Sequence, residues 1–178
     1  MSRWKLLSLL LQYPDEELLR LRDELPAWMR ETPLARLQAL YVRTFDFDRR
    51  ASLYLTYHTH GDRRQRGLEL VRLKRRYAEA GLPLTGGELP DYLPVLLEFA
   101  ALAPANGEPL LAECRVSIEL VRSRLHDIAS PYRDILDAVS AALPRPTRAQ
   151  IATARKLAQE GPPTELVGLE PFTAEVAS

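Results

Sequence analysis

Residues 44–62 read TFDFDRRASLYLTYHTHGD, and the rest of the chain is organised around them. The stretch contains four aromatic residues, two histidines, three aspartates and an arginine pair. It lies between two positions where a helix can begin, Asp46 or Asp48 and then Asp62, because aspartate is a preferred N-cap residue. Side chains that both pack and form hydrogen bonds are concentrated here, which is typical of a recognition surface rather than of a plain core helix.

The composition around this stretch indicates an all-α protein. The 178 residues are 46% hydrophobic and 27% charged, the balance of a globular domain. The 14 prolines outnumber the 8 glycines and mostly stand where helices begin or end, and long β-branched runs are absent. We therefore expect a single domain over residues 1–160, a bundle of about eight or nine helices, followed by an extended or disordered tail over residues 161–178.

Caps and helix breakers predict where the helices begin and end. Pro14 ends the first helix, and Thr147 can cap the last one. Gly61 and Gly81 are expected stop positions. Residues 104–107, which include a proline and a glycine, are predicted to form a turn. The expected helices cover approximately residues 2–12, 15–25, 32–45, 46–60, 62–80, 88–99, 108–126, 130–143 and 147–160.

The cysteine count and the apolar runs indicate a cytoplasmic protein. Cys114 is the only cysteine, so the chain has neither a disulfide framework nor a thiolate metal cluster. Arg3 and Lys5 precede the apolar residues 6–11, as in a signal peptide, but that run is short and has no small-residue cleavage site. No later run approaches the roughly 18 apolar residues of a transmembrane helix. We predict no insertion into a membrane.

Charge is distributed unevenly along the chain, although the formal net charge is zero. Residues 49–76 hold nine Lys or Arg against two acidic residues, whereas residues 77–178 carry a net charge of −6. The basic helix expected over residues 63–76 has two interpretations. Its arginines can pair with the acidic half of the same chain, or they can bind phosphates as part of a nucleic-acid-binding helical module. Most charge runs are solvated faces, so we predict no nucleic-acid partner and keep this module as the alternative function.

The histidine-containing end of the central stretch does not form a convincing metal site. Residues two apart on a helix point about 200° apart, so His58 and His60 cannot hold one ion there, with or without Asp62. No Glu-x-x-His or His-x-x-x-His sequence completes a site. We predict no metal and no bound cofactor.

Catalytic motifs are also missing from the sequence. There is no Gly-x-Ser-x-Gly and no phosphate-binding glycine loop, and Cys114 has no histidine near it in the chain. Asp46 and Asp48 can be imagined as an acid/base pair, but two aspartates at a helix start are more often caps. We therefore predict that the protein is not an enzyme. A helical bundle that binds an amphipathic peptide in a groove between helices fits the sequence better.

Two blocks of sequence carry a resemblance to a known family. Residues 45–67 read FDFDRRASLYLTYHTHGDRRQRG, and residues 89–99 read LPDYLPVLLEF. Together they closely resemble the NarJ-type assembly chaperones of respiratory nitrate reductases, also called delta subunits. These belong to the wider family of all-helical redox-enzyme maturation chaperones for molybdoenzymes. The resemblance covers about residues 5–145.

This resemblance implies a cytoplasmic, non-catalytic chaperone. Such a protein binds the N-terminal segment of the nitrate reductase catalytic (alpha) subunit and holds that subunit ready for insertion of its molybdenum guanine dinucleotide cofactor. It also delays docking on the membrane anchor subunit. The proteins that make the molybdenum cofactor are further candidate partners.

One family motif departs from its usual form in this chain. The wider family often carries Glu-Pro-x-Asp-His, whereas residues 88–92 here read ELPDY, with an inserted leucine and Tyr92 in place of the histidine. A role assigned to that histidine therefore does not transfer.

The candidate client-binding residues come from both blocks. Tyr54, Tyr57 and His58 are expected on one helix face within a single turn, where tyrosine rings can hold an apolar client side chain. Cationic groups of the client can form ion pairs with the aspartates. Arg49 and Arg50 can either form ion pairs with acidic groups of the client or link adjacent helix ends within this chain. The alternative is that these side chains are core or helix-end contacts. The full set is Asp48, Arg49, Arg50, Tyr54, Tyr57, His58, Asp62, Asp91 and Tyr92.

Overall fold

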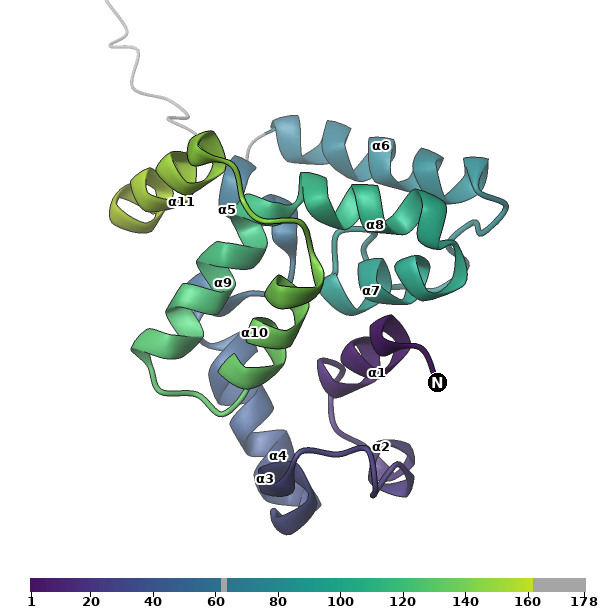
Figure 1. Ribbon diagram of the computed structural model, residues 1–178, viewed down its shortest axis with the longest axis vertical. Helices are drawn as coiled ribbons and strands as arrows, with labels where there is room; N and C mark the ends of the chain where they lie inside the picture. Colours follow the sequence, from purple (N-terminus) through teal and green to yellow (C-terminus); the bar gives the residue numbers. More distant parts are fainter. Residues whose placement is uncertain (62–63, 162–178) are drawn as a thin grey trace, which may run out of the picture.

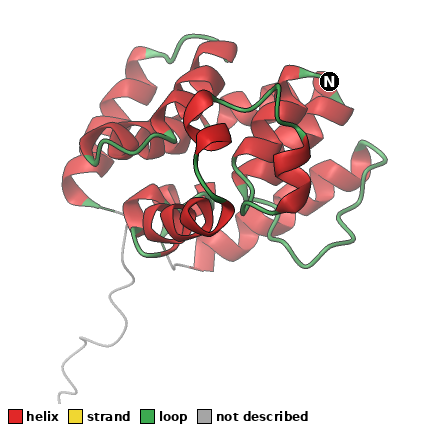
Figure 2. Ribbon diagram, turned by 90° about the horizontal axis from the view of Figure 1, so that it is seen from below, coloured by secondary structure: helices red, strands yellow, loops and turns green. Residues whose placement is uncertain are grey.

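The computed structural model describes residues 1–61 and 64–161, and this part of the chain is built from eleven α-helices (Figure 1). The all-α prediction is confirmed: Figure 2 shows helices and loops and no strand among these residues. The predicted tail over residues 161–178 lies, apart from Gly161, outside the described residues. The helices are α1 (Arg3–Leu10), α2 (Glu16–Arg20), α3 (Ala27–Glu31), α4 (Leu34–Tyr41), α5 (Leu55–His60), α6 (Arg64–Glu79), α7 (Leu93–Leu102), α8 (Pro104–Glu113), α9 (Arg115–Asp127), α10 (Arg133–Ala142) and α11 (Arg148–Glu160).

Two helices exceed the number expected from the sequence. The short helix α3 follows Pro26, in a segment to which the pattern assigns no helix. The turn predicted over residues 104–107 is wrong, because Pro104 takes the first position of α8, where its missing N–H is not needed. The helix expected over residues 108–126 is therefore divided at Cys114, which ends α8 and precedes α9.

The core is formed by two groups of helices that meet along buried aliphatic and aromatic side chains. Helix α7 lies between α1 and α8, and α9 packs against α10 and α11 (Figure 1). An aromatic cluster links α3 to the start of α10, where Tyr132 has its ring centroid 5.0 Å from that of Trp28 and 4.9 Å from that of Phe45. The hydroxyl of Tyr132 and the indole Nε1 of Trp28 are buried without a hydrogen-bond partner.

One junction brings together the two sequence blocks that carry the family resemblance. Tyr54 and Tyr92 form an isolated antiparallel β-bridge. The N–H of Leu55 donates to the carbonyl of Asp91 at 3.0 Å, and the N–H of Leu93 donates to the carbonyl of Leu53 at 2.8 Å. These bonds fix the start of α5 against the start of α7.

The lengths and compositions of the helices also bear on membrane association. Across the described ranges, none of the helices combines the length and the apolar character that crossing a bilayer requires.

Candidate peptide-binding site

The central stretch folds into three short helical pieces rather than one helix. A π-helix, η1 (Val42–Asp46), continues α4, and a 3-10 helix, η2 (Arg49–Ala51), follows it. Asp48 caps η2 by accepting a hydrogen bond from the N–H of Arg50 at 3.0 Å, so the cap expected at Asp46 or Asp48 is found at Asp48. The single helix expected over residues 46–60 is wrong, because η2 ends at Ala51, the backbone is extended at Tyr54 and α5 begins only at Leu55.

The interruption changes the geometry predicted for the tyrosines. Tyr54 precedes the first residue of α5 and takes part in the β-bridge, so Tyr54 and Tyr57 do not share a continuous helix face. Both tyrosines nevertheless line one surface depression of about 330 Å³, which we call the tyrosine hollow. Its lining consists of Phe45, Asp46, Arg49, Ser52, Tyr54, Tyr57 and Arg66.

Each tyrosine of the hollow is held by a specific contact. The Tyr54 ring lies 5.2 Å from the Tyr92 ring between centroids, and its hydroxyl donates to Glu88 Oε2 at 3.2 Å. The guanidinium carbon of Arg49 stands 5.2 Å from the centroid of the Tyr57 ring, a cation–π distance. Partial burial, together with the Glu88 carboxylate, raises the pKa of Tyr54 to about 12. Tyr54 is therefore a hydrogen-bond donor at every physiological pH.

Tyr92 and Asp91 lie behind the hollow rather than in it. The hydroxyls of Tyr92 and Tyr41 are 2.7 Å apart, and the Tyr41 hydroxyl also donates to the carbonyl of Leu11 at 3.2 Å. Asp91 is 0% exposed, and its Oδ2 accepts from the backbone N–H of Thr56 at 3.2 Å and from the Thr56 hydroxyl at 2.5 Å. The guanidinium of Arg66 lies 3.6 Å from the same oxygen. The Asp91 carboxylate therefore stabilises the fold and is not accessible to a client.

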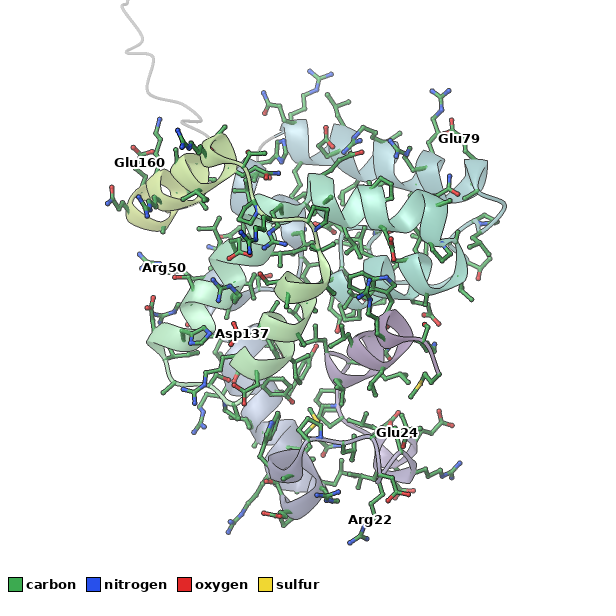
Figure 3. All side chains as sticks on the ribbon, in the orientation of Figure 1. Arg22, Glu24, Arg50, Glu79, Asp137 and Glu160 are labelled. Carbon is green, nitrogen blue, oxygen red and sulfur yellow. The ribbon has the colours of Figure 1, made fainter. Side chains whose placement is uncertain are left out.

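Three other candidates face α9, away from the tyrosine hollow. Arg124 Nε on α9 donates to Asp48 Oδ2 at 2.7 Å. His58 is 3% exposed, and its Nε2–H donates to the carbonyl of Ser52 at 2.7 Å. Burial lowers the pKa of His58, and the bond to Ser52 and the charge of Asp91 oppose that shift only in part. Arg50 projects from the edge of the molecule (Figure 3).

The histidines have separate partners. His60 Nδ1 is 2.9 Å from the Thr59 hydroxyl, whereas His58 points to Ser52. Within residues 1–61 and 64–161, no cluster of three or more His, Cys, Asp or Glu side chains is suitable for a metal ion. Asp62, the third candidate ligand and a predicted client-binding residue, lies outside the described residues.

The structure adds Phe45, Ser52 and Arg66 to the candidate surface. The sequence assigns Phe45 to an ordinary helix face and Arg66 to the basic run, and it gives no sign that both reach the hollow. Arg66 Nε donates to the Thr56 hydroxyl at 3.2 Å, which links α6 to α5. A ten-residue spacing across an interrupted segment carries no periodic signal that would reveal this contact.

The basic helix α6 is neutralised largely within the molecule. Arg72 pairs with Glu69 at 2.7 Å and with Glu113 of α8 at 2.9 Å, and Arg76 lies 3.6 Å from Glu113. Arg75 pairs with Glu79 at 2.8 Å. The interpretation of the charge asymmetry as pairing with the acidic half of the chain is thus supported for these arginines.

Comparison with known proteins relates the chain to one family. The family model described as nitrate reductase delta subunit matches residues 11–137. The probable nitrate reductase molybdenum cofactor assembly chaperone NarJ of Bacillus subtilis is 38% identical over 161 residues, covering 77% of this chain and 85% of the relative. The probable chaperone NarW of Escherichia coli, of the same description, is 32% identical over 157 residues, covering 76% of this chain and 65% of the relative. The nitrate reductase-like protein NarX of Mycobacterium tuberculosis is 38% identical over 153 residues, which cover only 23% of that longer protein.

Proposed function

This chain belongs to the nitrate reductase delta subunit family, and from that premise we propose that it is a dedicated assembly chaperone for a nitrate reductase. It acts in the cytoplasm on the catalytic (alpha) subunit before that subunit contains its molybdenum cofactor. By binding the N-terminal segment of the subunit, it keeps the client competent for cofactor insertion and delays docking on the membrane anchor. The cofactor belongs to the client, and the chaperone catalyses no reaction.

The observation that carries this proposal is that the first family block supplies the lining of the tyrosine hollow while the second block packs directly behind it. The β-bridge between Tyr54 and Tyr92 joins the blocks, and the ring of Tyr54 stacks on Tyr92 while facing the depression. Interface tyrosines commonly bury an apolar ring and keep the hydroxyl hydrogen-bonded, which Tyr54 already does through Glu88. A client segment gains apolar contact there without having to order these side chains first.

The charges of the hollow fit a segment that carries both apolar and polar groups. Asp46 is exposed, and its carboxylate can accept a hydrogen bond from a client cation. The guanidinium of Arg49 covers the Tyr57 ring. Asp91 and His58 are excluded as direct contacts by their burial. Of the predicted residues, we therefore assign client contact to Arg49, Tyr54 and Tyr57.

The test is calorimetry with a synthetic peptide that copies the first residues of the nitrate reductase catalytic subunit from the same organism. Tyr54→Ala and Tyr57→Ala should each weaken peptide binding about tenfold, as truncation of an interface aromatic commonly does. Tyr13→Ala is the matched control, because Tyr13 is an exposed tyrosine that lies outside the hollow. Thermal midpoints are measured on the same samples. If both hollow variants lose stability but bind the peptide as tightly as wild type does, the tyrosines are core residues and the site lies elsewhere.

The alternative function is nucleic-acid binding through residues 63–76. The internal pairs of Arg66, Arg72 and Arg76 weigh against it, because phosphate contacts would have to replace them. We expect no gel-shift of DNA or RNA at nanomolar protein and physiological salt. A shift with a steep salt dependence, lost on reversing Arg72 and Arg75 to glutamate, would favour the alternative.

A further inference from the structure

The residues that follow α11 begin close to the tyrosine hollow. Gly161, which ends α11, lines a smaller depression of about 60 Å³ together with Arg50 and His58. The residues directly before those two in the chain, Arg49 and Tyr57, line the hollow. The two depressions therefore lie on opposite sides of the short segments η2 and α5, and a helix with its side chains is about 10 Å across.

The segment after Gly161 is long enough to reach the hollow. Residues 162–178 can span up to roughly 50 Å when extended, at about 3.3 Å per residue. This is several times the width of the helical segments that lie between Gly161 and the hollow. The length of the segment therefore allows contact with the whole of the hollow.

Residues 162–178 are acidic and apolar in composition. The segment contains three acidic residues and no basic one, and larger apolar side chains are spaced among them. The acidic residues are Glu165, Glu170 and Glu175, and the apolar ones are Leu166, Val167, Leu169, Phe172 and Val176. Such a segment is complementary to a site that combines apolar walls with guanidinium groups, because carboxylates form strong charge-assisted hydrogen bonds with arginine.

The hollow and its edge offer both kinds of group. The rings of Tyr54 and Tyr57 are half-buried and form the apolar part of the lining. The Arg66 side chain remains 21% exposed although it pairs with Asp91. Arg50, beside the hollow, projects from the edge of the molecule (Figure 3). Glutamates of the segment can bind these guanidinium groups while its apolar side chains cover the tyrosine rings.

We propose that residues 162–178 occupy the tyrosine hollow when no client is bound, and that the client displaces them. This inference rests on the proposed function, because it takes the hollow to be the client-binding site. The segment binds less well than a client that carries a cation, since it has no basic residue to pair with Asp46. Its attachment compensates, because a linked group acts at an effective concentration on the order of millimolar.

The consequence is a site that selects its occupant. A foreign peptide has to displace the attached segment before it reaches Tyr54 and Tyr57, so weak apolar binders are excluded. A client that also pairs with Asp46 gains enough to replace the segment. The apparent affinity for every client is lowered by the fraction of chaperone molecules whose hollow is covered.

The first experiment measures peptide affinity by calorimetry. Deletion of residues 162–178 should tighten binding of the synthetic N-terminal peptide of the catalytic subunit about threefold to tenfold, because every hollow is then open. The matched control replaces the same residues by glycine and serine at equal length, and it should bind like the deletion variant. Phe172→Ala in the full chain should give part of this gain. High salt should reduce the difference between wild type and the deletion variant, since it screens the charge pairs.

The second experiment locates the contact by amide NMR of the client-free proteins. Deletion of residues 162–178 should shift the signals of Tyr54 and Tyr57. The signal of Leu102 should stay unchanged, because Leu102 is exposed on α7 and lies outside the hollow. Adding a synthetic peptide of residues 162–178 to the deletion variant should move the tyrosine signals back toward their positions in wild type. The spectrum of wild type should not depend on protein concentration, because the contact lies within one chain.

The outcomes separate this inference from the proposed function. If deletion changes neither the peptide affinity nor the tyrosine signals, the inference is wrong and the proposed function stands. Weaker peptide binding after deletion would make residues 162–178 part of the client site and would also overturn it. Signals that shift only outside the hollow, or only at high protein concentration, place the segment elsewhere or on a second copy, and overturn it as well. If no variant binds the client peptide, the proposed function fails, and the tyrosine signals still decide whether the segment occupies the hollow.

Discussion

Asp91 accepts hydrogen bonds from both the backbone N–H and the side-chain hydroxyl of Thr56, which lies 35 residues earlier in the chain. Thr56 is in the first turn of α5, so Asp91 caps this helix from a different segment. Arg66 approaches the same carboxylate from α6. Three separate segments thus meet at one buried charge directly behind the tyrosine hollow.

We predict that Asp91→Ala lowers the free energy of unfolding by about 2–4 kcal/mol, because it leaves Arg66 and the N–H of Thr56 without their buried acceptor. Asp91→Asn should cost less, since an amide oxygen can still accept from Thr56. Urea unfolding measures both changes. Asp46→Ala is the control, and removal of that exposed carboxylate should change stability by no more than about 0.5 kcal/mol. If Asp91→Ala were as mild as Asp46→Ala, the capping role assigned to Asp91 would be wrong.

The predictable part of the fold is the part that depends on neighbours in sequence. Asp15 caps α2, and Thr147 caps α11 in a reciprocal arrangement with Gln150, as helix-start signals indicate. The role of Asp91 depends instead on a partner 35 residues away. In the sequence Asp91 lies inside the helix expected over residues 88–99, where its charge suggests an exposed client contact rather than a buried cap. The same limit applies to Arg66, which lines the hollow but lies outside residues 45–57, where the other lining residues are found.

Gly107 shows why the local sequence does not always predict the role of a glycine, which can serve either a turn or a close contact between helices. Beside a proline and an asparagine it suggests a turn, yet it lies inside α8, where α8 crosses α7. A Cβ built on Gly107 would stand 2.4 Å from Cα of Ala100, a backbone atom that cannot move aside alone. The glycine is there for close helix contact rather than for chain reversal.

We predict opposite effects for two glycine-to-alanine substitutions. Gly107→Ala should destabilise the protein by about 1–3 kcal/mol or more, because it forces α7 and α8 apart. Gly67→Ala, on the exposed side of α6 with nothing within 4 Å, should stabilise it by about 0.5–1 kcal/mol through helix propensity. The free energies of unfolding of the two variants and of wild type, measured by chemical denaturation, test both predictions. A neutral Gly107→Ala would show that the helix crossing can relax.

Ala129 is the only residue other than glycine with a positive φ in the described ranges, at 50°. It follows the end of α9, where its N–H donates to the carbonyl of His126 and that of Ser130 to the carbonyl of Leu125, the arrangement of a Schellman cap. A left-handed backbone is strained in residues with a Cβ. Ala129→Gly should therefore raise stability by about 0.5–1 kcal/mol, measured as a shift in the denaturation midpoint. Ala129→Val should destabilise by at least as much, because β-branched side chains tolerate this conformation poorly.

His58 gives stability a pH dependence whose direction follows from its burial. Its pKa in the folded state is below the usual value of about 6.5, because the ring is buried and charging it would cost desolvation. Above pH 6.5 the ring is neutral in both states, and the stability it contributes is complete. As pH falls from about 6.5 toward the lower folded-state pKa, the unfolded chain takes up a proton that the folded protein does not, so stability is lost.

This loss can be isolated by comparing wild type with His58→Gln at each pH. One such group changes the free energy of unfolding by at most about 1.4 kcal/mol per pH unit. We expect the stability advantage of wild type over His58→Gln to be largest near pH 8 and to shrink as pH falls to about 5. Carboxylates that titrate in both proteins cancel in this difference. A difference that stays constant over the range would mean that His58 is protonated as easily in the folded protein as in the unfolded chain. The buried, neutral imidazole bonded to Ser52 would then be the wrong description of this side of α5.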